Sequence, residues 1–159
     1  MPDRPREITF RFLAEPIDMN YRGTVHGGTA MRWIDQTGYA CATGWCGQYC
    51  VTVYAGGIRF LKPIAINHLV EVHAKLIYTG TSSMHVAVTV SSANPRQQVF
   101  ERTTRCIVVY VAVDENGRPI PVPKWMPLTP EDVALEKHAV KVMEVAKQLD
   151  AEMPKEKQE

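Results

Sequence analysis

The chain has 159 residues, of which 45% are hydrophobic and 22% are charged, and its formal net charge is +1. This length and composition suit one folded domain with its own core and exclude a disordered chain. A balance this close to neutral gives no reason to expect a nucleic acid or an anionic membrane as partner.

The sequence gives no indication of a secreted or membrane-spanning protein. The first ten residues, MPDRPREITF, are charged and contain two prolines, unlike the apolar core of a secretory signal. No apolar run reaches the length of a membrane-spanning helix. The cysteine spacing fits neither a paired zinc motif nor a compact disulfide framework; the four are Cys41, Cys46, Cys50 and Cys106. We therefore expect a cytoplasmic protein with reduced cysteines and no metal.

The first half of the chain predicts one strand, one helix and a bent strand pair. Residues 8–13 are strand-like, and residues 20–28 form a glycine-rich loop. Thr29 to Thr43 has apolar residues at helical spacing and few polar ones on its other sides, which is typical of a buried helix. Residues 51–54 and 58–61 then read as strand segments, with a bulge or bend at the intervening Gly56-Gly57.

The second half predicts long strands followed by a helix. Residues 69–78, 84–90 and 99–113 are strand candidates, and the last of them reaches a hairpin-type turn. Thr129 with Pro130 and Asp132 predicts a capped helix start. The apolar face of this helix comprises Leu135, Ala139, Val142, Ala146 and Leu149.

These elements predict an α+β fold in which an antiparallel sheet wraps the first helix. The other face of the sheet then needs a cover, either the terminal helix or a second subunit. We expect residues 1–153 to form one domain and residues 154–159 to form a disordered tail.

Asp35 stands out because it is the only acidic residue between Met19 and Val70, in the middle of the first predicted helix. Burying an ionised carboxylate without partners is costly. One interpretation is a structural ion pair with Arg32 or Arg22. We favour a functional carboxylate, since buried acids are more often kept for a site than for stability.

The residues around Asp35 support this interpretation. Gly27 and Gly28 at the helix start leave backbone N–H groups pointing outward, which suits an anion or an oxyanion. Asp35, two turns further along, could act as base or nucleophile on a carbonyl held there. Asn20 could orient a water or the substrate. The region is locally positive, which suits an anionic small ligand; its basic residues are Arg22, Arg32, Arg59 and Lys62.

These residues form a recognisable motif. The pattern N-x-x-G-x-x-x-G-G, followed by an aspartate seven residues on, consists here of Asn20, Gly23, Gly27, Gly28 and Asp35. It resembles the signature of hotdog-fold acyl-CoA thioesterases, and more narrowly of the acyl-CoA hydrolases that handle fatty acyl-CoAs. The segments FLKPI, GTSSM and VAVDENGRPIPVP match the family in order and spacing. The resemblance covers residues 10–137, nearly the whole domain.

The resemblance implies a hotdog fold and hydrolysis of fatty acyl-CoA to free CoA and a carboxylic acid, with no cofactor. It implies that Asp35 is the catalytic carboxylate, that Asn20 places the lytic water or the thioester, and that the Gly28 N–H polarises the thioester oxygen. The expected substrate contacts, chiefly with the phosphates and adenosine of CoA, are Gly27, Arg59, Lys62, Thr81, Ser82 and Ser83.

One position departs from the family, which commonly has arginine where this chain has Thr81. Lys62 and Arg59 are the candidates to compensate in phosphate binding. The resemblance also implies a homodimer, assembled further into a tetramer or hexamer, in which the asparagine and the aspartate of one site come from opposite subunits.

Two other functions stay open on this fold. A hotdog hydratase or dehydratase would need a catalytic histidine paired with an acid near the helix start, and no such motif is found. A non-enzymatic acyl-CoA sensor would need an output module, for which we expect no room in this chain. The sensor would therefore require a separate partner for regulation, and we expect neither a nucleic acid nor a membrane as partner of this chain.

Overall fold

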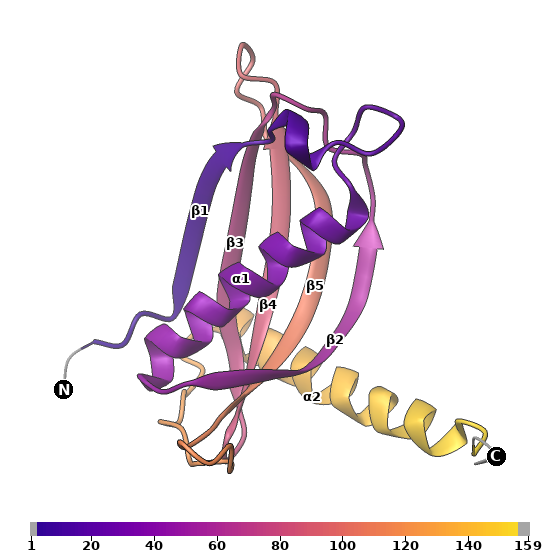
Figure 1. Cartoon of the computed structure of the whole chain (residues 1–159). Helices are drawn as coiled ribbons and strands as arrows, with labels where there is room; N and C mark the ends of the chain where they lie inside the picture. Colours follow the sequence, from indigo (N-terminus) through magenta and orange to yellow (C-terminus); the bar gives the residue numbers. More distant parts are fainter. Residues whose placement is uncertain (1–2, 156–159) are drawn as a thin grey trace.

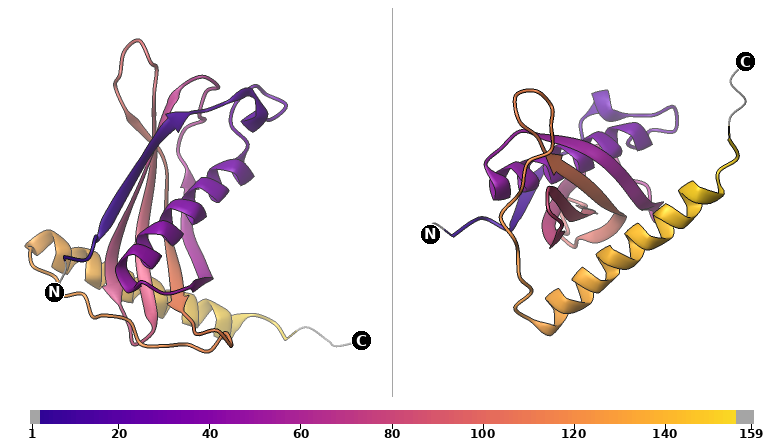
Figure 2. Two further views of the ribbon diagram at one scale, coloured as in Figure 1. Left: turned by 60° about the vertical axis from the view of Figure 1, so that its left-hand side comes forward. Right: turned by 90° about the horizontal axis from the view of Figure 1, so that it is seen from below.

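The computed structural model describes residues 3–155, which form a five-stranded antiparallel sheet with one long helix on each face (Figures 1 and 2). The strand order is β1-β3-β4-β5-β2, so β1 and β2 are the two edges. The elements are β1 (Glu7–Leu13), the short 3₁₀ helix η1 (Pro16–Asp18), α1 (Gly27–Cys46), β2 (Cys50–Phe60), β3 (Leu69–Thr79), β4 (Ser83–Ala93), β5 (Glu101–Ala112) and α2 (Pro130–Glu152). The predicted α+β class, with a sheet curved around one helix, is confirmed.

The edge strand β2 differs from the prediction in one respect. The two expected segments are one continuous strand, which pairs with β5 throughout. The register shifts between Thr52 and Tyr54 and again between Gly56 and Arg59, and Gly57 has a φ of +66°. The bend expected at Gly56-Gly57 is therefore real, but a bulge absorbs it without ending the strand. This bend lets β2 curve around α1 (Figure 1).

The helix α1 packs on the concave face of the sheet through one side only. Its buried residues recur every three to four positions: Ala30, Trp33, Ile34, Thr37, Gly38, Cys41, Ala42, Trp45 and Cys46. The opposite side is open, and Met31 is 46% exposed. The prediction that α1 is buried all round is therefore wrong for the single chain, because the sheet covers only one of its sides.

The helix α2 covers part of the outer face of the sheet. Ala139 packs there with Ile77 and Ile107. The predicted apolar face is correct up to Ala146, but Leu149 is 61% exposed because α2 continues beyond the edge of the sheet (Figure 1). None of the helices between residues 3 and 155 is long and apolar enough to cross a membrane. The predicted disordered tail lies mostly outside the described residues.

Candidate active site

The open side of α1 carries Asp35. Five residues at helical spacing form this side, which we call the open stripe: Gly28, Met31, Arg32, Asp35 and Gln36. The sequence predicts a buried Asp35, and that prediction is wrong for the single chain, where Asp35 is exposed. Within residues 3–155, no lysine, arginine or histidine nitrogen lies within 4.0 Å of its carboxylate. The alternative of an ion pair with Arg22 or Arg32 is therefore not observed.

Two hydroxyl groups from the sheet hold the Asp35 carboxylate instead. Thr52 on β2 donates to Oδ1 at 2.9 Å, and Tyr110 on β5 donates to the same oxygen at 3.1 Å. The Tyr110 hydroxyl also lies 2.9 Å from the backbone carbonyl oxygen of Asp35. Both donors are neutral, and no described residue donates to Oδ2. One carboxylate oxygen is thus anchored, and the other is free to face a substrate.

Tyr110 is fully buried although it carries a polar hydroxyl. The alternation along β5 places its ring on the α1 side of the sheet, with Val108 and Ala112. Burial, and next the negative charge of Asp35, raise the pKa of Tyr110 above its usual value. The phenol therefore stays protonated and remains a donor. It reaches Asp35 beneath Gly38, where an added Cβ would overlap the Tyr110 hydroxyl.

The start of α1 presents free backbone N–H groups. His26 is the N-cap residue, and its side chain makes no capping hydrogen bond. The Ala30 amide bonds to the His26 carbonyl at 3.1 Å, so the three amides before it have no partner within the helix. They belong to Gly27, Gly28 and Thr29. Together with the positive end of the helix dipole, they suit a negatively charged or polarised oxygen.

Asn20 lies in the loop before α1, where its side chain organises a turn. Its Oδ1 accepts hydrogen bonds from the backbone amides of Arg22 (2.9 Å) and Thr24 (3.2 Å). Its Nδ2 donates to the Thr24 hydroxyl at 3.0 Å. A pocket of about 290 Å³ is lined by Asn20, Gly27 and Lys62, among others. The structure thus brings three of the predicted site residues together beside the start of α1.

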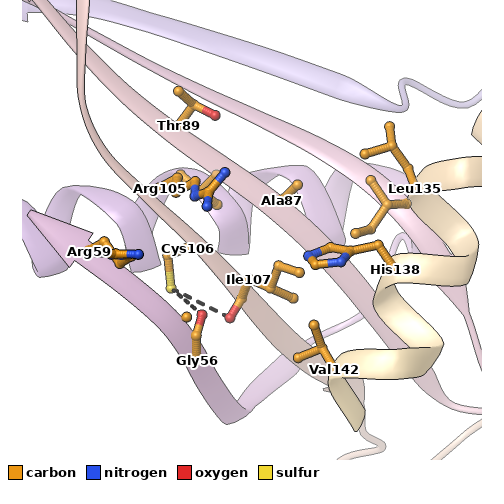
Figure 3. Close-up of a pocket in the computed structure, with 13 residues that line it drawn as sticks. Gly56, Arg59, Ala87, Thr89, Arg105, Cys106, Ile107, Leu135, His138 and Val142 are labelled. Carbon is orange, nitrogen blue, oxygen red and sulfur yellow. Dashed lines mark hydrogen bonds between the residues drawn. The ribbon is translucent and has the colours of Figure 1, made fainter. Parts of the chain in front are cut away.

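Arg59 does not join this group. It pairs with Arg105 in the β2–β5 register, and directly opposed residues share a face of the sheet. Both arginines line a separate pocket of about 350 Å³ on the outer face, which α2 closes through Leu135 and Val142 (Figure 3). Lys62 is exposed and forms an ion pair with Glu101 at 2.9 Å.

The segment from Thr81 to Ser83 is also remote in the single chain. It comprises the turn between β3 and β4 and the first residue of β4, at the end of the sheet opposite the start of α1 (Figure 1). The Thr81 and Ser82 carbonyls accept hydrogen bonds from the amides of Val122 (2.9 Å) and Ala112 (3.0 Å), which fixes the turn. One chain therefore does not bring the predicted CoA contacts together.

Thr52 and Tyr110 are missing from the predicted site. They belong to strands far from α1 in sequence, so no local spacing connects them with Asp35. Two weak signals exist: a tyrosine inside the otherwise apolar run CIVVYVAV, and Gly38 inside a helix. Each indicates a special packing requirement, but only the fold shows that both meet at Asp35.

The structure offers no metal-binding cluster within its described residues, judged by groups of three or more His, Cys, Asp or Glu side chains. All four cysteines are buried free thiols. Burial raises the pKa of the Cys41 thiol to about 11, which keeps it protonated and unreactive at neutral pH.

Known proteins resemble this chain over most of its length. Residues 22–99 match the thioesterase superfamily. The acyl-CoA thioester hydrolase YciA of Salmonella typhimurium is 33% identical over 121 residues, which cover 74% of this chain and 90% of that protein. A crystal structure of an apo-hexameric acyl-CoA thioesterase superposes with a TM-score of 0.90 at 29% identity, covering 96% of this chain and 98% of that one.

The acyl-CoA hydrolase of Staphylococcus aureus is a further structural relative. Its structure in complex with butyryl-CoA, CoA and CoA disulfide gives a TM-score of 0.84 at 27% identity, covering 92% of this chain and 89% of that one. Variants of that protein have been solved in which one asparagine, one aspartate or one threonine is replaced by alanine. Along the S. aureus chain those three residues have the same spacing as Asn20, Asp35 and Thr52 have here.

Proposed function

This chain belongs to the acyl-CoA thioester hydrolases of the thioesterase superfamily, and we propose that it hydrolyses the thioester of a fatty acyl-CoA to free CoA and a carboxylic acid. The observation that carries the proposal is the Asp35 carboxylate, anchored at Oδ1 and free at Oδ2. The matching spacing of Asn20, Asp35 and Thr52 in the S. aureus hydrolase supports it.

Asp35 can act in either of two ways. As a base, Oδ2 takes a proton from a water that attacks the thioester carbonyl, and the CoA thiolate leaves. As a nucleophile, Oδ2 attacks the carbonyl itself, the C–S bond breaks, and CoA leaves as the thiolate. Water then hydrolyses the resulting anhydride, which gives the free acid and restores the Asp35 carboxylate. In both cases negative charge develops on the carbonyl oxygen, where the Gly28 N–H would stabilise it.

Distance indicates that these two groups act from different subunits. Gly28 and Asp35 are seven residues apart on α1, which is about 10 Å along a helix. Groups that act on one carbonyl must both lie about 3 Å from it. If two α1 helices run antiparallel about a two-fold axis near Met31, Asp35 of one chain lies level with Gly28 of the partner subunit. We therefore propose a site shared across a homodimer.

The edge strand β2 supports the same dimer. Within residues 3–155 only β5 pairs with β2, and Val51 (44%) and Val53 (55%) are exposed on it. Such an edge readily pairs with a second copy, which would extend the sheet across the dimer. Antiparallel pairing would also bring the partner's β3–β4 turn to the end of the sheet where this chain has Lys62. We propose that the dimer assembles further into a tetramer or hexamer, since solved relatives are hexameric.

This arrangement would collect the predicted CoA contacts. Lys62 is exposed, and its ion pair with Glu101 lies at the surface, where such pairs are weak and a phosphate can replace the carboxylate. Thr81, Ser82 and Ser83 of the partner subunit would supply neutral donors. Lys62→Ala should therefore raise KM for acyl-CoA and leave KM unchanged for a thioester that lacks the nucleotide.

The proposed activity is tested by measuring CoA release from acetyl-CoA to palmitoyl-CoA with a thiol reagent. We expect steady turnover, with a maximum whose position reports the preferred acyl length. Binding without release would support the acyl-CoA sensor instead. Water addition to an enoyl-CoA would support the hydratase, although His26 at the helix start is exposed and has no acidic partner within the described residues.

The shared site is tested by complementation. Asn20→Ala and Asp35→Ala should each be nearly inactive alone. In a mixed dimer, one site has both residues and the other has neither. Random reassortment makes about half the dimers mixed, so co-refolding should recover about a quarter of wild-type activity. Confirmed subunit exchange without recovery would contradict the shared site.

A further inference from the structure

We propose that Tyr110 is a positioning residue for hydrolysis: its hydroxyl fixes Asp35 through Oδ1 so that Oδ2 is the reacting oxygen. This inference rests on the proposed role of Asp35. Tyr110 lies beneath α1 and is fully buried, so it acts through Asp35 and does not itself touch the substrate.

The contacts of the Tyr110 hydroxyl are unusual because both acceptors belong to one residue. The hydroxyl lies 2.9 Å from the Asp35 carbonyl oxygen and 3.1 Å from Oδ1. One proton shared between these oxygens ties the side-chain rotamer of Asp35 to its own backbone. Thr52, which lies directly opposite Tyr110 in the β2–β5 register, adds a second donor to Oδ1. A carboxylate fixed at one oxygen by two elements presents the other oxygen in one direction.

The packing of α1 on β5 leaves space for the Tyr110 hydroxyl at Gly38. Gly38 is one helical turn after Asp35, and a Cβ there would overlap the Tyr110 hydroxyl and lie 3.1 Å from two carbons of its ring. A glycine inside a helix is destabilising relative to alanine. Gly38 has no positive φ, so its backbone conformation does not require glycine. Glycine is required at this position because the Tyr110 hydroxyl occupies the space of a Cβ.

The identity of residue 110 leads to the same conclusion. Its ring packs in the core with Val108 and Ala112, where a phenylalanine would fill the same volume without needing a polar partner. A buried hydroxyl is costly unless it is hydrogen-bonded, and both bonds that Tyr110 donates go to Asp35. The position therefore gains nothing for packing from tyrosine, and what the hydroxyl adds is the contact with Asp35.

The test compares Tyr110→Phe with a matched control, Tyr39→Phe. The Tyr39 ring packs edge-on against Tyr110 at 5.9 Å, and its hydroxyl accepts a hydrogen bond from the Cys50 amide at 3.2 Å, away from Asp35. Both variants lose one inner hydroxyl of the same region, but only one of these hydroxyls holds the carboxylate.

For Tyr110→Phe we expect kcat to fall by at least about tenfold with KM unchanged, since a misplaced reacting group costs rate rather than binding. Tyr39→Phe should keep the wild-type kcat and the wild-type KM.

Asp35→Asn is measured in parallel to separate the two proposals. If it is inactive while Tyr110→Phe and Tyr39→Phe have equal kcat and equal KM, the role of Tyr110 is overturned and that of Asp35 stands. If Asp35→Asn keeps its turnover, both roles are overturned. Should Tyr110→Phe fail to fold, Gly38→Ala decides, because it keeps the phenol but displaces its hydroxyl. A wild-type kcat in Gly38→Ala would then overturn the proposal.

Discussion

The two long helices each carry an aspartate that other elements hold in place, and they hold it in opposite ways. Asp132 at the start of α2 is buried, and its carboxylate pairs with the Arg6 guanidinium at 2.7 Å. Asp35 on α1 is exposed in the single chain, and among the described residues only the hydroxyls of Thr52 and Tyr110 hold its carboxylate. A cation neutralises a carboxylate, whereas hydroxyls orient it and leave its charge available.

Asp132 has the contacts of a structural residue. Besides Arg6, it accepts a hydrogen bond from the Leu128 amide at 3.2 Å. Burial acts to raise the pKa of Asp132, but the Arg6 guanidinium and the backbone amides outweigh it and hold that pKa below its usual value. Arg6 also stacks on Trp125 at 4.3 Å and donates to the Leu76 carbonyl at 2.9 Å. The pair thus fastens the N-terminal segment, β3 and α2 to one another.

The largest expected effect is that of a substitution at Asp35. We expect Asp35→Asn to lower kcat by at least about a hundredfold, because an amide cannot serve as base or nucleophile. Binding of acyl-CoA and the melting temperature should stay close to wild type, since an exposed carboxylate without a cation contributes little to folding. Turnover within a few-fold of wild type would show that the free oxygen is not the reacting group.

The reciprocal change is Asp132→Asn. We expect a clearly lower melting temperature, because the variant leaves the Arg6 guanidinium without its charged partner. The kcat per folded molecule should remain within about twofold of wild type, as for substitutions outside a site. Thermal denaturation and active-site-normalised assays measure the two effects. A loss of kcat without loss of stability would abolish the distinction between the two aspartates.

The contribution of the Asp132 charge to stability should depend on pH. A carboxyl whose pKa is lower in the folded than in the unfolded chain adds stability above its unfolded pKa of about 3.9, and that stability is lost as pH falls through the folded value. The melting temperatures of wild type and Asp132→Asn should therefore differ most at neutral pH and converge below about pH 4. A difference that stays constant down to pH 3 would exclude the charge of Asp132 as its source.

The smallest expected effect concerns Thr52. Thr52→Val keeps the shape of the side chain and removes one of the two donors to Oδ1. One hydrogen bond is worth about 1 kcal/mol, so we expect kcat to fall about fivefold. Thr43→Val is the control, since the Thr43 hydroxyl donates only to backbone carbonyls of α1, those of Tyr39 and Ala40. Equal kcat values in the two variants would leave Tyr110 as the sole anchor.

Most of the fold follows from periodicity in the sequence. The strand candidates, both helices and the bulge at Gly56-Gly57 lie within a few residues of the observed elements. The open stripe of α1 was not predicted, although three of its five residues, Arg32, Asp35 and Gln36, are charged or polar at helical spacing and indicate an exposed side. The prediction that Leu149 packs on the sheet is wrong, because a helical pattern does not reveal where the sheet beneath the helix ends.

The sequence motif covers only the local part of the candidate site. Asn20, Gly28 and Asp35 share this short motif, and their roles stay predictions. The hydroxyls that hold Asp35 come from β2 and β5, and their meeting depends on strand order and on the bend of β2. Long-range pairing of this kind leaves no spacing in the sequence.

The close approach at Gly38 has a consequence for how this protein can change during evolution. Gly38 and Tyr110 depend on one another, since a side chain at position 38 would displace the phenol of Tyr110. We expect alanine to replace Gly38 only together with, or after, loss of the hydroxyl at position 110. We expect the two positions to covary among relatives, with tyrosine found opposite glycine and phenylalanine opposite alanine, so that an ancestral substitution in one restricts the choices left to the other.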